Sequence, residues 1–354
     1  MPPRVWLLEP YRAGEQQQVL ALAEALGWPF ECRRLHYHRL RGAATNLGRG
    51  TGLSGIDLRR SDALAAPWPD LLITAGMRNE PVARWVRMRS GGRTRLVHLG
   101  RPWADPAHFE LVITTPQYRL PQRPNVLHND LPLHRIQGTR LADAAARWLP
   151  SLAALPAPRI AVIVGGNSGP YTLGARAARR LLDEAAALAR NARGSLLIST
   201  SPRTPAAALA QLQRDCGVPV QLYRWRPEDP ANPYFGYLAL ADALVVTADS
   251  ISMLAEAGAT GKPLYLFDLG AGRRRMRPGH GNGVDDWRLG GELYRVLMRW
   301  GWQRLSRDIT LVHRRLIDSG RATWVGDGHP NPVATGDTDL QRALARVRAL
   351  FPEH

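Results

Sequence analysis

The segment Asp242–Pro263, with the sequence DALVVTADSISMLAEAGATGKP, contains the residues best suited to bind a phosphorylated ligand. A short apolar strand ends at Thr247, and a helix is predicted from Met253 to Ala259. The amides and dipole of a helix N-terminus favour an anion. Either Ser250 or Ser252 could cap the helix, but capping alone does not require the whole TADSIS run. The ligand-binding residues predicted here are Thr247, Asp249, Ser250, Ser252 and Met253.

Two charged residues follow in the same segment. Glu256 lies in the early part of the predicted helix, where a carboxylate can reach paired ribose hydroxyls. Lys262 is the only lysine among 47 Lys and Arg residues. It either marks a position where a compact ammonium is needed and a guanidinium does not fit, or is simply the one lysine that remains; both interpretations stay open.

Ligands of open parallel α/β sheets bind beyond the carboxyl ends of the strands, so the loops that follow strands matter most. The predicted strand Arg159–Val164 is followed by GGNSG at 165–169. Its amides could cradle an anion. A tight structural turn explains these glycines equally well. The candidate ligand-binding residues in this loop are Gly165, Gly166, Asn167 and Ser168.

A second loop, STSPRTP, follows the predicted strand Ser195–Thr200. Ser201 and Arg203 suit contact with a phosphate and are predicted ligand-binding residues. Thr204 stands directly before Pro205 and is better explained as the N-cap of the next helix.

The chain alternates apolar strands with helices twice, which predicts parallel sheets covered on both faces. The Pro-rich segment PSLAALPAPR separates the two series. The expected fold is therefore α/β, with two Rossmann-like parallel-sheet domains facing a cleft. Their boundaries are 1–150 and 157–320, and 321–354 is a tail with a helix that packs back on the first domain. The predicted strands are 5–8, 70–74, 94–99, 110–114, 159–164, 195–200, 220–225, 244–247 and 264–267.

Composition limits the class of protein. The 354 residues are 45% hydrophobic and 22% charged, which is typical of a globular chain. No apolar run approaches the roughly 20 residues that span a bilayer. The start of the chain lacks the pattern of a signal peptide, and Cys32 and Cys216 cannot form a disulfide framework. We expect a cytoplasmic location, with room for peripheral contact at the inner face of the membrane.

The net charge of +17 is spread along the chain by arginine usage, so nucleic acid is not the expected partner. The cluster at 84–95 is typical of a solvated helix face. The denser cluster RRRMR suggests contact with an anionic membrane surface; its arginines are Arg273, Arg274, Arg275 and Arg277. No metal-binding spacing appears, and no cofactor is expected.

Several motifs together resemble the mitochondrial fission Elm-type family. They are RAGEQQQVLALAEALG, ITAGMRNEPVARWVRMRSGG, VIVGGNSGPYTL, STSPRTP and NPYFGYLALADALVVTADSISMLAEAGATGKPLYLF, in this order. The resemblance runs from about Val5 to Phe267 and resumes near Leu311–Gly320. The family is in turn similar to GT-B glycosyltransferases. An epimerase of the Rossmann type is not expected, because no GxGxxG opens the first domain and the sole lysine, Lys262, is not part of a YxxxK motif.

The resemblance implies a GT-B-type glycosyltransferase that takes a nucleotide-sugar as substrate, with the donor in 157–320 and an acceptor in 1–150. The alternative is a non-catalytic scaffold that binds a nucleotide or a protein. Gly14, which opens the first helix, joins the predicted binding residues. By resemblance, Ser250 and Ser252 meet the diphosphate and Glu256 the ribose, Gly165, Gly166 and Ser168 line the cleft, and Asn232 and Tyr234 lie on the base side.

An inverting transfer needs a general base. Glu80, His98 and Asp105 follow predicted strands of the first domain and are the candidate catalytic residues. Each of them also suits a capping or surface role.

Overall fold

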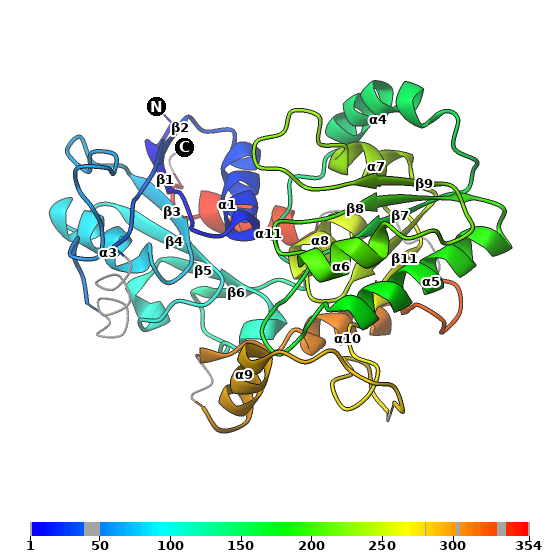
Figure 1. The fold of residues 1–354 in the computed structure, drawn as a ribbon. Coiled ribbons are helices and arrows are strands. Elements are labelled where there is room, and N and C mark those ends of the chain that lie inside the picture. Colours follow the sequence, from blue (N-terminus) through cyan, green and yellow to red (C-terminus); the bar gives the residue numbers. More distant parts are fainter. Residues whose placement is uncertain (1, 39–49, 280, 302–304, 331–337, 353–354) are drawn as a thin grey trace. The chain divides into compact units, whose positions relative to one another are not determined.

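The chain forms two compact units in a computed structural model that describes residues 2–38, 50–279, 281–301, 305–330 and 338–352 (Figure 1). Unit 1 consists of Met1–Arg135 with Asp337–His354, and unit 2 of Ile136–Gly336. The division after Arg135 differs from the predicted boundary at 150, because the helix that follows packs within unit 2.

The sheet of unit 1 has six strands in the order β2-β1-β3-β4-β5-β6, all parallel. Its central strands are continuous apolar runs whose side chains are buried on both faces, as expected of a covered parallel sheet. The strands are β1 (Val5–Leu8), β2 (Phe30–Arg33), β3 (Leu71–Ala75), β4 (Arg95–Leu99), β5 (Leu111–Thr114) and β6 (Val126–His128).

Helices cover both faces of this sheet. On one face, α1 (Ala13–Leu26) packs beside α11 (Thr338–Arg348), and the apolar positions of both helices share a core with β1 and β3. The C-terminal helix thus belongs to unit 1. On the other face, α3 (Glu80–Arg89) buries Val82 and Val86 against the sheet.

The sheet of unit 2 also has six parallel strands, in the order β12-β11-β10-β7-β8-β9. The chain starts at the centre with β7, builds outward through β8 and β9, and then returns to the other side of β7 with β10. The strands are β7 (Arg159–Ile163), β8 (Ser195–Ser199), β9 (Val220–Tyr223), β10 (Ala243–Thr247), β11 (Leu264–Phe267) and β12 (Thr323–Trp324).

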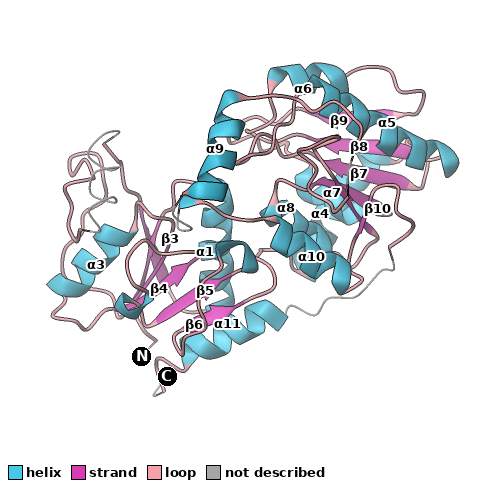
Figure 2. Ribbon diagram, turned by 90° about the horizontal axis from the view of Figure 1, so that it is seen from below, coloured by secondary structure: helices cyan, strands magenta, loops and turns pink. Residues whose placement is uncertain are grey.

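Unit 2 carries most of the helices in the described residues (Figure 2). The first of them, α4, packs on α7, where the Trp148 ring leaves no room for a side chain at Gly236. No helix in the described ranges is long and apolar enough to cross a membrane. The helices are α4 (Gly138–Leu152), α5 (Ala175–Asn191), α6 (Ala206–Leu212), α7 (Tyr234–Leu240), α8 (Ile251–Gly258), α9 (Leu289–Trp300) and α10 (Thr310–Asp318).

The predicted fold class, two Rossmann-like domains with parallel sheets, is confirmed. In unit 2 the strand order reverses between β7 and β10, whose carboxyl ends are neighbours. Helices that leave such neighbours in opposite directions open a crevice at the sheet edge, which is where ligands of this fold class bind. The loops that follow β7, β8 and β10 therefore define the candidate site.

Candidate functional site

The loops after β7, β8 and β10 meet at the carboxylate of Asp249. Its Oδ2 atom accepts a hydrogen bond of 3.0 Å from the Gly166 amide and lies 2.8 Å from Nη1 of Arg203. Next to it, the Thr247 hydroxyl accepts from the Gly165 amide at 2.7 Å. One residue from each of the three loops is thus bound into a single polar cluster at the predicted crevice.

The Asp249–Arg203 pair is buried at one end and open at the other. The Asp249 side chain has no exposed surface, whereas 38% of the Arg203 side chain is exposed. Burial raises the pKa of Asp249, while the charge of Arg203 and the hydrogen bonds from Gly166 and Thr247 act in the opposite direction. The carboxylate alone would repel a phosphate. Arg203 offsets that charge and presents its guanidinium toward solvent.

Close packing between loops explains the first two glycines of GGNSG. A Cβ atom at Gly165 would lie 2.5 Å from both carboxylate oxygens of Asp249. At Gly166 it would overlap the backbone carbonyl of Arg203. The glycines therefore allow the loops to approach one another, whether or not a ligand is bound.

The loop after β8 is held against the Gly165 carbonyl. Ser201 donates to this oxygen at 2.7 Å and Thr204 at 2.6 Å. Thr204 was expected to cap the next helix, and this expectation is wrong. Helix α6 begins at Ala206 with Pro205 at the N-cap and has no side-chain capping bond, because the Thr204 hydroxyl is turned toward the β7 loop.

Helix α8 begins at Ile251, two residues earlier than predicted. Ser250 is its N-cap residue, but the Ser250 side chain makes no capping bond. Ser252 falls in the first turn and, like Met253, is half-buried. The amides of this first turn have no partners within the helix, so the N-terminus of α8 presents donors and the positive end of its dipole beside Arg203 and Asp249.

Glu256 and Tyr234 form a pair further along the same edge. The Tyr234 hydroxyl donates a short hydrogen bond to Oε2 of Glu256, and Glu256 is 8% exposed. Burial and the Glu256 charge raise the pKa of Tyr234 well above its ordinary value, so its hydroxyl remains a donor. The Asn232 side chain accepts at 3.0 Å from the amide of Tyr234, the first residue of α7. The structure brings these three predicted residues together.

Lys262 does not join the site. It precedes β11 and lies at the amino edge of the sheet, whereas the candidate site lies at the carboxyl edge. Its ammonium donates to the carbonyls of Leu238 and Ala239 at 2.8 and 2.5 Å, which satisfies the last turn of α7. These contacts do not support Lys262 as a ligand-binding residue; they make it a C-terminal cap of α7.

Asn167 and Ser168 hold the far end of the β7 loop. The Asn167 side chain accepts from the Leu173 amide at 3.0 Å, and the Ser168 hydroxyl accepts from Arg307 at 2.9 Å. Arg288 and Arg295 donate to the carbonyls of Gly169 and Pro170. These three arginines come from the segment around α9 and were not predicted, since no local motif connects them with a loop more than a hundred residues away.

His313, on α10, is a second contribution that the sequence did not indicate. Its Nε2 atom lies 2.6 Å from the Ala248 carbonyl, so this nitrogen carries the proton and donates to the β10 loop. Burial lowers the pKa of His313 to about 4, although the bond to Ala248 acts to raise it. A neutral imidazole packed against Trp324 thus fixes the backbone next to Asp249.

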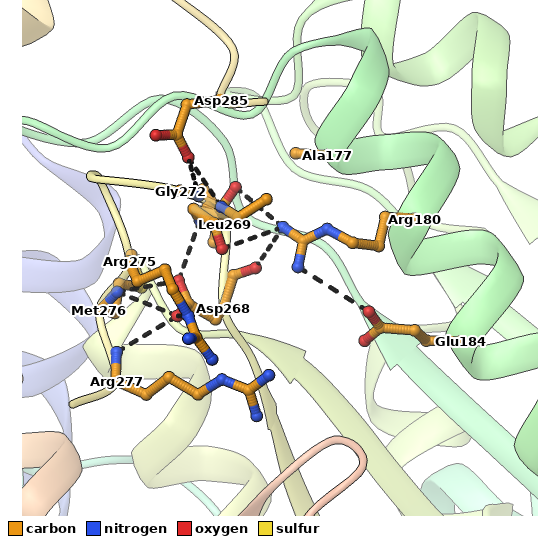
Figure 3. A network of polar contacts seen from close by, with 12 residues as sticks. Ala177, Arg180, Glu184, Asp268, Leu269, Gly272, Arg275, Met276, Arg277 and Asp285 are labelled. Atoms are coloured by element: carbon orange, nitrogen blue, oxygen red, sulfur yellow. Dashed lines mark hydrogen bonds and ion pairs between the residues drawn. The ribbon is translucent and has the colours of Figure 1, made fainter. Parts of the chain in front are cut away.

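The arginine cluster of 273–277 is folded around two carboxylates (Figure 3). Asp268, directly after β11, accepts from the amides of Gly270, Met276 and Arg277. Asp285 accepts from three further amides of the same loop. Burial raises the pKa of Asp268, opposed by its amide donors. The segment is therefore folded around one buried acceptor, Asp268, and one half-buried acceptor, Asp285.

The side chains of this cluster are mostly engaged within the protein. Arg274 pairs with Glu292 at 2.7 Å and Arg277 with Asp327 at 3.1 Å. Arg275 lies 4.0 Å from Asp268, while Arg273 is exposed. The predicted membrane contact through all four arginines is not supported by this arrangement, because three of them already have carboxylate partners.

The candidate catalytic residues of unit 1 are each held in place by contacts within that unit. Both carboxylate oxygens of Glu80 accept from backbone amides, those of Trp103 and Ala104. His98 is fully buried beside Phe109, and burial lowers its pKa to about 4. These two residues are thus fixed within unit 1 rather than exposed for proton transfer.

Asp105 and Gly14 complete the predicted residues of unit 1. Asp105 accepts from the Ala107 amide and pairs with Arg123, and both hydrogen bonds lower its pKa. It caps the 3₁₀ helix η1 (Pro106–His108), which leaves no sign of a tuned base. Gly14 lies in the first turn of α1, and its carbonyl accepts from Gln18.

Solved structures resemble this one at the level of the fold alone. UDP-GlcNAc 2-epimerase from Neisseria meningitidis matches with a TM-score of 0.45 and 10% identity, over 89% of this chain and 99% of that chain. MurG from Acinetobacter baumannii matches with a TM-score of 0.42 and 14% identity, over 98% and 100% of the two chains. In this chain the two units each contain a parallel sheet, and the C-terminal helix belongs to the first of them.

Sequence comparison gives the family. The mitochondrial fission protein ELM1 of Arabidopsis thaliana is 30% identical over 220 residues, which are 56% of this chain and 51% of that protein, so the match spans about half its length. An uncharacterised protein of Rickettsia prowazekii, RP120, is 26% identical over 298 residues, 74% of this chain and 82% of that protein. The model of the family described as mitochondrial fission ELM1 matches residues 13–282. The chain therefore belongs to the mitochondrial fission ELM1 family.

Proposed function

We propose that the carboxyl edge of the unit 2 sheet binds a nucleoside diphosphate-sugar and that the protein is a GT-B-type glycosyltransferase. The observation that carries this proposal is the convergence of three loops at the strand-order reversal, with Arg203, the start of α8 and the Glu256–Tyr234 pair along one edge. A phosphate needs hydrogen-bond donors and positive charge, whereas the ribose hydroxyls need an acceptor. This edge offers both kinds of group.

The diphosphate is assigned to the start of α8. Helix N-termini favour anions through their amides and dipole, and Ser250 adds a hydroxyl that is not used for capping. Arg203 supplies a fixed positive charge whose planar fork suits phosphate oxygens. Asp249 serves as a positioning residue beneath this site rather than as a ligand contact, because it is enclosed by the loops it joins.

The ribose is assigned to Glu256. A carboxylate accepts two hydrogen bonds from paired hydroxyls, and one oxygen of Glu256 already accepts from Tyr234. This tyrosine fixes the carboxylate on the side of α7, and the base would lie beyond it, near Asn232. Tyr234 is half-buried and can offer an apolar ring edge to the base.

A non-catalytic scaffold of the same family is the second candidate, and one observation favours it. Glu80, His98 and Asp105 are held by backbone amides, burial or an arginine, so none has the environment of a base tuned to neutral pH. Binding in unit 2 does not depend on these residues, and the two candidates therefore share the donor site and differ only in turnover.

A nucleotide screen followed by a donor-hydrolysis assay tests the proposal. UDP, GDP, ADP and CMP are added in a thermal-shift assay; a ligand at a hundredfold excess over its Kd stabilises by about 2.7 kcal/mol. Arg203→Ala is expected to lose the shift, whereas the exposed Arg226→Ala should keep it. No shift with any nucleotide would refute the donor site. Slow hydrolysis of the matching nucleotide-sugar would favour an enzyme over a scaffold.

We also infer that the protein works in a reducing compartment such as the cytoplasm. Cys32 is exposed and Cys216 buried, and both are free thiols.

A further inference from the structure

Helix α9 exposes a continuous apolar face. Leu289, Leu293, Val296 and Trp300 are 61%, 64%, 59% and 77% exposed. Residues of an α-helix turn by about 100° each, so positions spaced by four, three and four residues fall on one side. Trp287, just before the helix, is 63% exposed as well. An uncovered apolar stripe of this size is uncommon on a protein surface and indicates a contact with another protein or with a membrane.

The opposite side of α9 is fixed to the candidate site. Gly291 packs on the Pro170 backbone, and the Tyr294 ring lies against Gly169. Arg295 donates to the Pro170 carbonyl at 3.1 Å, and the Tyr294 hydroxyl accepts from the Arg307 amide at 3.0 Å. The polar side of the helix is therefore used inside unit 2, whereas the apolar stripe stays uncovered by that unit.

The charge around the stripe points to an anionic partner. The sequence from Leu293 to Arg307, LYRVLMRWGWQRLSR, contains four arginines and no acidic residue. Arg299 is exposed and lies 5.3 Å from the Trp300 ring. Tryptophan and arginine beside leucine and valine are typical of helices that lie in the interface of a bilayer.

We propose that α9 docks on an anionic lipid bilayer, with Leu289, Leu293, Val296 and Trp300 below the headgroups and the exposed Arg299 at their level. A second copy of the chain fits less well, because a symmetric contact would bring the Arg299 side chains of both copies together, while Glu292, the acidic residue of α9, is already paired with Arg274 and Arg295. Docking in this way would place the loop Gly169–Pro170, which α9 contacts, beside the membrane surface.

Vesicle flotation tests the proposal with the full chain. The protein is mixed at low salt with vesicles of phosphatidylcholine alone or of equimolar phosphatidylcholine and phosphatidylglycerol. We expect binding to the anionic vesicles only, weakened but not abolished by high salt. The double variant Leu293→Glu/Val296→Glu should lower the partition coefficient at least about tenfold, because two inserted side chains are lost.

Leu149→Glu is the matched control, because Leu149 is a leucine exposed on another helix of unit 2, at 48%. It should leave vesicle binding unchanged, and thermal melts should show that both variants fold. The proposal fails if no vesicle retains the protein, or if the double variant binds as the unchanged chain does. It also fails if light scattering shows that the double substitution converts a dimer into a monomer while vesicles have no effect.

Discussion

The guanidinium of Arg203 lies 2.8 Å from the enclosed carboxylate of Asp249. This one contact joins the loop after β8 to the loop after β10, and the Gly166 amide adds the loop after β7. The candidate site is thus organised around a buried acceptor whose charge is offset by a half-exposed donor. Such a pair is sensitive to the loss of either member, since the other is then left without compensation.

Removal of Arg203 should destabilise the fold in a manner that depends on pH. Arg203→Ala leaves Asp249 buried and without a counter-charge, which should cost about 3 kcal/mol near neutral pH. Burial already raises the pKa of Asp249, and the substitution raises it further. The folded state then binds a proton more readily than the unfolded state, so the deficit should shrink toward pH 5. Urea unfolding of the unchanged chain and of Arg203→Ala at pH 7.5 and pH 5 measures this. An equal loss of unfolding free energy at both pH values would contradict the prediction.

A side chain at Gly166 should disrupt the site. In Gly166→Ala the added Cβ overlaps the Arg203 carbonyl, so the β7 and β8 loops must separate. We expect a loss of about 3 kcal/mol in unfolding free energy together with weaker nucleotide binding. Gly138→Ala is the control, because nothing lies within 4 Å of its added carbon. Similar melting temperatures for the two variants would contradict the packing argument.

His313 should make stability fall in acid. Its pKa of about 4 in the folded chain lies below the ordinary value of 6.5, so the unfolded state binds a proton first as the pH drops. The contribution, about 3 kcal/mol, is present above pH 6.5 and is lost as the pH approaches 4. His313→Gln keeps a donor for the Ala248 carbonyl and does not titrate. Its melting temperature should therefore change less between pH 7 and pH 5; an unchanged slope would exclude His313 as the cause.

Tyr234 should hold Glu256 in place without being required for binding. Tyr234→Phe removes the hydroxyl that donates to Oε2 of Glu256 and leaves the charge of the carboxylate unchanged. The nucleotide Kd should change by less than about fivefold. The Glu256 carboxylate loses one neutral donor, and a ribose hydroxyl can take its place. Calorimetric titration measures this, and complete loss of binding would show that the Tyr234 hydroxyl itself contacts the ligand.

The sequence was sufficient for the regular parts of the fold. Apolar runs such as Leu71–Ala75 and Arg159–Ile163 form central strands of parallel sheets, where burial on both faces leaves a clear hydrophobic signal. Three of the four edge strands carry no such signal and were missed, whereas the edge strand β9 was predicted; β6, one of the three, has only three residues. β2 (Phe30–Arg33) is mostly exposed and contains charges, and β12 (Thr323–Trp324) has two residues, so neither was predicted.

The candidate site was predicted in its position but less well in its individual contacts. The motifs GGNSG, STSPRTP and TADSIS do meet at one edge, because loops after adjacent parallel strands must. From the sequence, Lys262 was either a residue whose ammonium is needed or simply the one lysine that remains. Only the hydrogen bond to α7 shows what its ammonium contacts. His313 and Arg307 reach the site through tertiary packing, which no local pattern encodes.

The most direct test of the donor site compares nucleotide affinity in Glu256→Gln with that in Glu228→Gln, whose glutamate is exposed on unit 2. The ligand is whichever of UDP, GDP, ADP and CMP stabilises the unchanged chain, and its Kd is measured by calorimetric titration. Loss of a charged acceptor for the ribose should weaken binding about tenfold or more in Glu256→Gln, and Glu228→Gln should bind as the unchanged chain does. Equal affinity in both variants would contradict a donor site at the carboxyl edge of the unit 2 sheet.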